Sequence, residues 1–295
     1  MTTQTRCLLP QALAHSTQLS YTRSWQKYLD FTHHIGIVAH LPISIRYACL
    51  FLVYLFNQNF SISSLSNIMS GLSYYHKMRI LPDPFISFPV RQLVQALKKN
   101  SPSTPDTRRP ISEIMLLQLV DKLQILALPI YESQLLATMM LFSFYFGLRL
   151  GEFTSSQHNL QFNDIAVTSE SVIITFHSHK HSNRQSLPHI IGKTNLRHCP
   201  VVYANRYLSL RPHVPGPFFI FRNKPVSPKY FAAKLKQLIT LLSLPPQFYS
   251  PHSFRIGAAT HWFAKDFSEQ RIRQLGRWSS NAFSAYIRNY VNHSS

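Results

Sequence analysis

Apolar residues recur every three or four positions over most of the chain, a spacing that predicts amphipathic helices. In the first third of the chain, four stretches show this spacing: 16–36, 43–58, 61–78 and 88–99. The first of them is predicted to end near Gly36, because glycine is common just past a helix end. Helices this short gain most of their stability by packing their apolar faces together. The pattern therefore predicts a small helical bundle.

The pattern continues after residue 110 and changes once. Four segments there have helical spacing: 111–126, 131–153, 199–212 and 227–242. Ser112 is a suitable N-cap for the first, and the second is predicted to be a buried helix that ends between Gly147 and Gly151. Residues 164–191 instead alternate apolar and polar positions, which predicts a short hairpin or meander. The expected fold class is mainly α with a small antiparallel β-sheet.

A stretch rich in Pro, Ser, Thr and charge, residues 98–112, separates the two patterns and is predicted to be an interdomain linker. It divides the chain into residues 1–105 and 106–295, both of ordinary domain size. The chain has no internal repeat, no GxGxxG and no P-loop, so we expect no nucleotide and no other cofactor.

The excess of positive charge indicates that this helical protein binds a polyanion. The chain has 30 Lys and Arg against 11 Asp and Glu, a net charge of +19, and such an excess is typical of nucleic-acid binding. The alternative is a membrane surface, but the longest apolar runs, 48–56 and 135–148, are too short to cross a bilayer. Three scattered cysteines, Cys7, Cys49 and Cys199, indicate a reducing, intracellular compartment.

Most of the candidate functional residues lie in three short motifs. GLRLGEF holds Arg149 and Glu152, SPHSFRIGAAT holds His252 and Arg255, and LGRWSSNAFSAYIR ends near Tyr286. His252 and Arg255 are one helical turn apart and so share a face. Taken singly, each motif also fits an ordinary role: a local ion pair, a polar pair at an interface, or one tyrosine among 14.

The sequence around His252 also predicts local structure. Ser250 is predicted to cap the helix that contains His252, with Pro251 at its first position, and helix N-termini favour anions. The Gly257–Ala259 run is predicted to serve close helix packing.

The order and spacing of these motifs resemble the catalytic signature of the tyrosine recombinase (phage integrase) family. The stretches HSFRIGAAT, IRQLGRWSS and YIR are similar to those of the recombinases of eukaryotic mobile elements, the DIRS-like retrotransposons and cryptons. The resemblance covers most of residues 110–290. It implies an N-terminal SAM-like helical DNA-binding bundle and an α+β catalytic domain that close on duplex DNA as a clamp.

The resemblance also implies the chemistry. Tyr286 would attack a DNA phosphodiester and form a 3′-phosphotyrosyl intermediate, while Arg149 and Arg255 bind its non-bridging oxygens. Lys180 would protonate the leaving 5′ oxygen unless it only contacts phosphate. His252 would assist proton movement, and Glu152 would orient its neighbours. With arginines supplying the charge, no metal is required.

The family's His or Trp normally lies nine residues before the tyrosine, and here two residues compete for that place. The spacing selects Arg277, while the residue type selects Trp278, and GRW sequences favour Trp278 as the catalytic residue with Arg277 supporting it. His177, His179 and His181 alternate around Lys180. They are predicted to be a polar strand edge or a phosphate-contacting loop, with a zinc site as the less favoured alternative.

The function expected from the resemblance is site-specific cleavage and rejoining of DNA for a mobile element, by a dimer or tetramer on double-stranded DNA. No membrane or nucleotide partner is expected, and the compartment would be the nucleus in a eukaryote or the cytoplasm otherwise. A type IB topoisomerase, a catalytically silent DNA-binding protein and a basic scaffold for RNA remain as alternatives.

Overall fold

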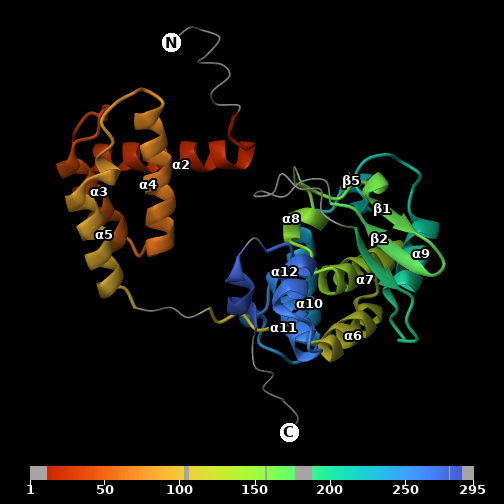
Figure 1. The fold of residues 1–295 in the computed structure, drawn as a ribbon. Coiled ribbons are helices and arrows are strands. Elements are labelled where there is room, and N and C mark those ends of the chain that lie inside the picture. The colour runs from red at the N-terminus through yellow and green to blue at the C-terminus, as the bar shows by residue number, and fades with distance from the viewer. Residues whose placement is uncertain (1–11, 103–105, 157, 177–187, 279, 288–295) are drawn as a thin grey trace. The chain divides into compact units, whose positions relative to one another are not determined.

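The computed structural model describes residues 12–102, 106–156, 158–176, 188–278 and 280–287 (Figure 1). The chain forms two compact units, Met1–Pro105 and Asp106–Ser295. Each unit has a hydrophobic core of its own. No helix within these described residues has the length and apolar character that crossing a bilayer requires.

The first unit consists of helices only. Its elements are α2 (His15–His34), α3 (Ile45–Asn57), α4 (Ile62–Lys77), the 3-10 helix η2 (Pro84–Ile86) and α5 (Phe88–Asn100). Ser44 and Ser61 start α3 and α4, because their side chains accept the N–H groups of Tyr47 and Ser64. The four helices predicted from apolar spacing are confirmed.

Aromatic side chains form the centre of this first core. Tyr28 and Phe31 of α2 contact Phe51 of α3, with ring centroids 5.4 and 5.2 Å apart. All three side chains are buried. Such aromatic pairs add stabilisation beyond the apolar area that they bury, so these rings join α2 to α3.

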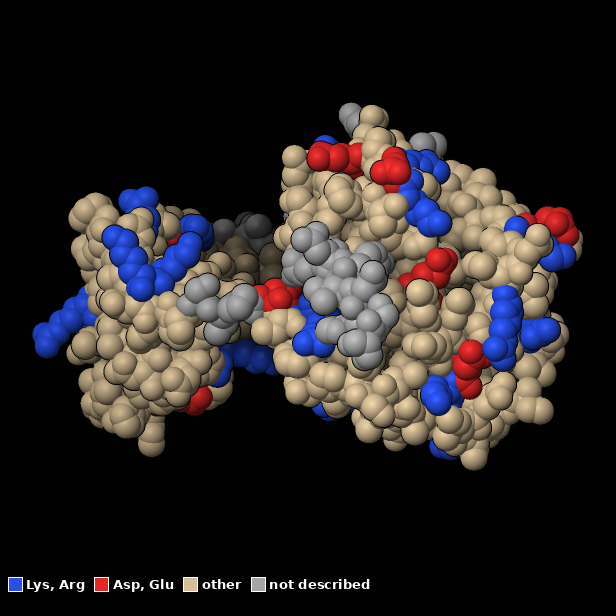
Figure 2. Space-filling model, turned by 90° about the horizontal axis from the view of Figure 1, so that it is seen from below, with Lys and Arg blue, Asp and Glu red and all other residues tan. Residues whose placement is uncertain are grey.

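The surface of the first unit is strongly cationic. Its 105 residues contain nine Lys and Arg but only two acids, Asp30 and Asp83. The Asp83 side chain is only 4% exposed, and it accepts hydrogen bonds from Ser73 and from the N–H of Phe85. Asp83 therefore offers little negative charge to solvent. Among the charged side chains on the face shown in Figure 2, those of the first unit are mostly Lys and Arg, whereas the second unit presents both signs side by side.

The second unit is a mainly helical assembly with a small sheet. Its helices are α6 (Glu113–Lys122), η3 (Leu123–Leu126), α7 (Ile130–Tyr145), α8 (Leu150–Phe153), η4 (Phe162–Asp164), α9 (Pro200–Leu210), α10 (Pro228–Leu241), η5 (Pro246–Phe248), α11 (His252–Ala264), α12 (Glu269–Gly276) and η6 (Asn281–Tyr286). Its strands are β1 (Ile165–Val167), β2 (Ser171–Ile174), β3 (His189–Gly192), β4 (Ile220–Phe221) and β5 (Lys224–Pro225).

The predicted meander is confirmed as an antiparallel sheet of order β1–β2–β3. Val172 in the central strand lies opposite Val167 of β1 and Ile191 of β3. Side chains on β2 alternate between buried and half-buried, as expected for a strand with one face on a core. Helix α9 lies against this sheet and against α7 (Figure 1). The short β4–β5 hairpin was not anticipated.

Helix α7 crosses the core and ends close to the place that the sequence predicted. Its residues from Leu135 to Phe144 are all buried, as the apolar run implied. It stops at Tyr145, next to the predicted end between Gly147 and Gly151. Gly147 adopts φ +54°, a left-handed conformation that ends a helix. A separate one-turn helix, α8, then begins after Arg149.

Helix α11 packs closely against the segment that precedes α6. A Cβ at Gly257 would lie 1.9 Å from the backbone oxygen of Ile111, so only glycine permits this approach. The predicted packing role of the Gly257–Ala259 run is confirmed for its glycine.

Candidate functional site

Arg149 and Glu152 are joined by the local geometry of α8. Arg149 is the N-cap residue of this helix, and its backbone N–H donates to Oε2 of Glu152 at 2.7 Å. Its guanidinium Nη1 also donates to Oε1 of Glu152 at 3.0 Å. The carboxylate thus satisfies a free N–H of the helix start and holds the arginine side chain at the same time. The Arg149 side chain stays 43% exposed.

Arg277 reaches the same carboxylate from the other end of the unit. It follows α12 with φ +55°, and its Nη2 lies 2.6 Å from Oε2 of Glu152. The side chain is 2% exposed and also donates to the carbonyls of Phe146 and Gly147. Its guanidinium lies 4.0 Å from the ring centroid of Phe176. Both Nη atoms of Arg277 therefore donate to protein groups, and the guanidinium is surrounded by protein.

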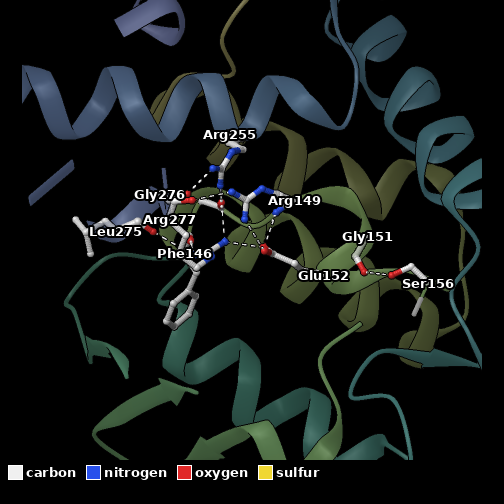
Figure 3. Close-up of polar contacts among 10 residues, drawn as sticks. Phe146, Arg149, Gly151, Glu152, Ser156, Arg255, Leu275, Gly276 and Arg277 are labelled. Carbon is white, nitrogen blue, oxygen red and sulfur yellow. Dashed lines mark hydrogen bonds and ion pairs between the residues drawn. The ribbon is translucent and has the colours of Figure 1, made fainter. Parts of the chain in front are cut away.

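Arg255 completes a group that we call the arginine frame: Arg149, Glu152, Arg255 and Arg277 (Figure 3). The Arg255 guanidinium donates to the carbonyls of Gly147 and Gly276, while Arg149 donates to the carbonyl of Arg277 at 2.7 Å. Three guanidinium charges and one carboxylate leave two positive charges at this position. Fixed guanidiniums of this kind suit the oxygens of a phosphate group.

Burial and neighbouring charges set the protonation of the frame. Burial alone would raise the pKa of Glu152, but the charges of Arg277 and Arg149 outweigh it and lower that pKa to about 2. Burial lowers the pKa of Arg255 and of Arg277. An arginine nevertheless stays charged in proteins, so the frame is cationic at neutral pH.

His252, Trp278 and Tyr286 form an aromatic group beside the frame. The ring of Tyr286 lies 5.1 Å from that of His252 and 5.6 Å from that of Trp278, between centroids. Trp278 in turn lies 4.2 Å from the guanidinium of Arg255, a cation–π distance. The Tyr286 carbonyl accepts the hydroxyl of Thr260 at 3.1 Å. The tyrosine is thus attached to α11, on which His252 and Arg255 also lie.

His252 is held in its neutral form. Burial lowers its pKa to about 4, and the positive charges of Arg108 and Arg255 add to this effect. Its Nε2 is buried and has no hydrogen-bond partner among the described residues. A buried polar atom without a partner is costly unless a ligand uses it, so this nitrogen is available to a bound group.

In the LGRW turn, the indole of Trp278 leaves no room for a side chain at Gly276. A Cβ at Gly276 would lie 1.6 Å from Cζ3 of Trp278, so the ring rests directly on the backbone there. Because of this turn, Arg277 points into the frame while Trp278 faces Tyr286. The two residues that competed for one position in the sequence therefore occupy two different places.

One local prediction at α11 is wrong. The helix begins at His252 with Pro251 as its N-cap residue, and the hydroxyl of Ser250 is buried without a hydrogen bond among the described residues. Instead, the Ser253 hydroxyl accepts the N–H of Ser250 at 3.1 Å. The proline occupies the cap position, which displaces the serine by one residue.

Lys180 lies outside the described residues, and so do His177, His179 and His181. In the sequence they fall between β2 and β3. Among the residues that the structure does describe, no cluster of three His, Cys, Asp or Glu side chains could hold a metal ion.

The structure adds two residues that the sequence did not single out. Arg108 and Asp106, in the predicted linker, are near enough for their charges to affect His252. Nothing in their sequence distinguishes them from other linker residues.

No family profile and no curated protein matches the chain. Its fold, however, is similar to that of solved recombinases. The integrase of the Tn1549 transposon in complex with transposon right end DNA has a TM-score of 0.65 at 13% identity, over 94% of this chain and 90% of that one.

Two further structures agree. A lambda integrase dimer bound to a COC′ core site has a TM-score of 0.63 at 14% identity, covering 99% of this chain and 77% of that one. The XerH site-specific recombinase on its difH substrate, before cleavage, has a TM-score of 0.63 at 12% identity, over 90% and 75% of the two chains. The chain therefore has the tyrosine recombinase fold, and the predicted fold class is confirmed.

Proposed function

We propose that this protein cuts and rejoins DNA strands at specific sites through a covalent bond between Tyr286 and a 3′ phosphate. The observation that carries the proposal is the position of the Tyr286 ring, in contact with His252 and with Trp278, whose ring in turn lies 4.2 Å from the guanidinium of Arg255. A nucleophile, a neutral base and fixed positive charge are the parts that such a reaction needs. The fold, shared with the solved recombinases, supports it.

The reaction balances without an outside energy source. The phenol of Tyr286 gives its proton to neutral His252 as its oxygen attacks phosphorus, the bond to the 5′ oxygen breaks, and that oxygen takes up a proton. A strand bearing a 5′ hydroxyl then reverses the step, releasing the tyrosine. Because the phosphotyrosyl ester conserves the energy of the broken link, rejoining needs no nucleotide.

Arg149 and Arg255 are proposed to bind the non-bridging oxygens. Each Arg255 Nη atom gives one hydrogen to a backbone carbonyl and carries a second that a phosphate oxygen can accept. Glu152 and Arg277 support this arrangement, since the Glu152 carboxylate accepts hydrogen bonds from both Arg149 and Arg277. Trp278 is proposed to take the family's His/Trp role, because it faces Tyr286 whereas Arg277 faces Glu152.

Lys180 is proposed to protonate the leaving 5′ oxygen. Lys180→Ala should then slow cleavage of ordinary DNA by about 10²–10⁴-fold, the usual contribution of a general acid. A substrate with sulfur at the bridging 5′ position needs no such proton and should restore the rate. Lys193→Ala is the control, and equal defects of Lys180→Ala on both substrates would leave Lys180 as a phosphate contact only.

Double-stranded DNA is the proposed substrate, with residues 1–105 as a helical DNA-binding domain and 106–295 as the catalytic domain. The cationic surface of the first unit supports this division. Exchange of strands between two duplexes requires a dimer or tetramer. The GRW form of the turn supports a place among the recombinases of eukaryotic mobile elements, and in that case the protein works in the nucleus.

The decisive test uses a nicked duplex, selected from a random-sequence pool by its binding to the protein. Tyr286→Phe should remove the covalent adduct and leave DNA affinity nearly unchanged, because only the nucleophilic oxygen is lost. Tyr290→Phe, four residues further on, is the matched control. Persistence of the adduct in Tyr286→Phe would refute the proposal. Relaxation of plasmid DNA without recombinant products would instead indicate a topoisomerase.

A further inference from the structure

The segment before α6 is fixed against the start of α11. The N–H of Arg109 donates to the carbonyl of Phe248 at 2.8 Å, and that of Ile111 donates to the carbonyl of Ser253 at 3.1 Å. The Arg109 guanidinium also lies over the Phe248 ring, 4.7 Å from its centroid. This half of the predicted linker is therefore an ordered part of the second unit, next to His252.

Arg108 lies in this segment and is paired with Asp106. Its Nε donates to Oδ1 and its Nη2 to Oδ2 of the carboxylate, at 2.8 and 2.9 Å. This two-bond arrangement is the one in which a guanidinium also binds a phosphate. The side chains are 42% and 35% exposed, so solvent, and a DNA backbone, can reach the pair.

The pair borders the site that contains Tyr286. Ile111, three residues after Arg108, is hydrogen-bonded to Ser253, the neighbour of His252, and the ring of His252 contacts that of Tyr286. This backbone pairing places the Arg108 segment at the edge of the site, outside the arginine frame. The hydrogen bond to Asp106 is the main cause that raises the pKa of Arg108, with a Tyr286 phenolate a smaller one, and the charge of Arg108 adds to burial in lowering the pKa of His252.

We propose that Arg108 is a further substrate-binding arginine, which exchanges the carboxylate of Asp106 for a non-bridging oxygen of the phosphate attacked by Tyr286. This inference rests on the proposed function. Exchange at Asp106 is favoured because exposed ion pairs contribute little to stability. Glu152, which is buried and shared by two arginines, cannot release its partners as readily.

The test measures the rate of adduct formation in a single turnover on the selected nicked duplex. Arg108→Gln should slow this rate by about 10–100-fold, at or below the loss caused by removing one fixed donor to a developing charge. Arg109→Gln removes the same charge from the neighbouring residue and should change the rate by less than about threefold, within the scatter of surface substitutions. Asp106→Asn should increase the rate at subsaturating DNA, because it frees the guanidinium.

The outcomes separate this inference from the proposed function. It is overturned if Asp106→Asn slows the reaction as much as Arg108→Gln, since the pair would then act as a structural unit. It is also overturned if Arg108→Gln matches Arg109→Gln while Tyr286→Phe still removes the adduct, and the proposed function would survive that result. Failure of the unaltered protein to form an adduct would refute both.

Arg108→Lys guards against a folding defect. It keeps the charge and loses the fork, so its rate should lie between those of the unaltered protein and Arg108→Gln. Suppose that Arg108→Lys reacts no faster than Arg108→Gln at equal melting temperature. The positive charge at position 108 would then not contribute to the rate, and the inference would be overturned.

Discussion

The arginine frame and the segment that carries Tyr286 meet at Trp278, but they are held in different ways. The guanidiniums of Arg255 and Arg277 are buried and donate to backbone carbonyls, and Arg277 also pairs with Glu152. Among the described residues, Tyr286 is positioned by two ring contacts and by one hydrogen bond to its carbonyl. Charge is thus in place before any substrate binds, which is the arrangement that most lowers a reaction barrier.

Substitutions in the arginine frame and in the segment that carries Tyr286 should therefore have different effects. Removing a member of the frame leaves a buried charge without its partner, so the fold itself suffers. Changing a contact of Tyr286 removes only packing or one hydrogen bond, so the chemistry should suffer more than the fold. Four substitutions or measurements test this contrast.

The largest effect is expected for Arg277→Met. It leaves Glu152 buried with Arg149 as its remaining ion-pair partner, and breaking a buried pair costs about 3–5 kcal/mol. The free energy of unfolding of the second unit, measured in urea by tryptophan fluorescence, should fall by that amount. Arg271→Met, at an exposed position of helix α12, which Arg277 follows, should change it by less than about 0.5 kcal/mol.

The double variant Glu152→Gln/Arg277→Met should recover part of this loss, because it also removes the carboxylate. Equal losses for Arg277→Met and Arg271→Met would show that the buried pair does not stabilise the unit.

Periodicity in the sequence predicted the long helices of both units and the three-stranded sheet, because each of these elements must bury one face, but it did not predict the β4–β5 hairpin. The sequence also predicted that α7 ends near Gly147, but it did not predict that a separate one-turn helix, α8, follows. The Ser250 cap failed because residue preferences act only locally, and in the fold Pro251 takes the cap position.

The site was predictable where chemistry needs rare residues at fixed spacing, as with Arg149, Arg255 and Tyr286. Their roles are still untested. The competition between Arg277 and Trp278 was not solvable from sequence, because a left-handed turn after Gly276 separates two adjacent side chains. The sequence did not indicate Arg108. This residue comes near the site only because the backbone of residues 109–111 is hydrogen-bonded to residues 248–253, which are far away in the sequence.

A smaller loss is expected for Gly276→Ala, which acts on the junction between the two parts. Its Cβ would lie 1.6 Å from Trp278, so the indole must move away from Tyr286. Overpacking should cost about 1–3 kcal/mol, and displacement of a positioning side chain by about 1 Å should slow adduct formation by about 10²-fold.

Gly192→Ala is the control for this substitution, because no atom lies within 4 Å of its added Cβ. Unfolding in urea and the adduct assay would both be measured. A Gly276→Ala protein with an unchanged rate would show that the position of Trp278 is unimportant for the reaction.

The third prediction concerns the pH dependence of His252. Its pKa in the folded protein is about 4, below the ordinary 6.5, because of burial and then the charges of Arg108 and Arg255. The folded state binds this proton more weakly than the unfolded chain. The stability contributed by neutral His252 is therefore complete above pH 6.5 and is lost as the pH falls toward 4.

The titration would be followed by NMR of the imidazole ring. A midpoint near 4 is expected, and a midpoint at the ordinary value would contradict the burial and charge described for this group. The other charged groups that act on it are Asp106, which raises its pKa, and Arg149, which lowers it. Arg108→Gln should raise the midpoint, whereas Arg109→Gln should not.

The smallest effect is expected for Thr260→Val, and a matched residue makes it measurable. The Thr260 hydroxyl is shared between the carbonyls of Ile256 and Tyr286, at 2.9 and 3.1 Å. In α7, the buried hydroxyl of Thr138 is shared in the same way between the carbonyls of Gln134 and Tyr203, at 2.8 and 3.2 Å. Each valine should lower the free energy of unfolding by about 1 kcal/mol, the usual net value of such a bond. Adduct formation should slow only in Thr260→Val, because only that hydroxyl holds the backbone of the attacking residue. If Thr138→Val slows the reaction equally, the effect comes from general loosening of the unit, and the separate attachment of Tyr286 would be refuted.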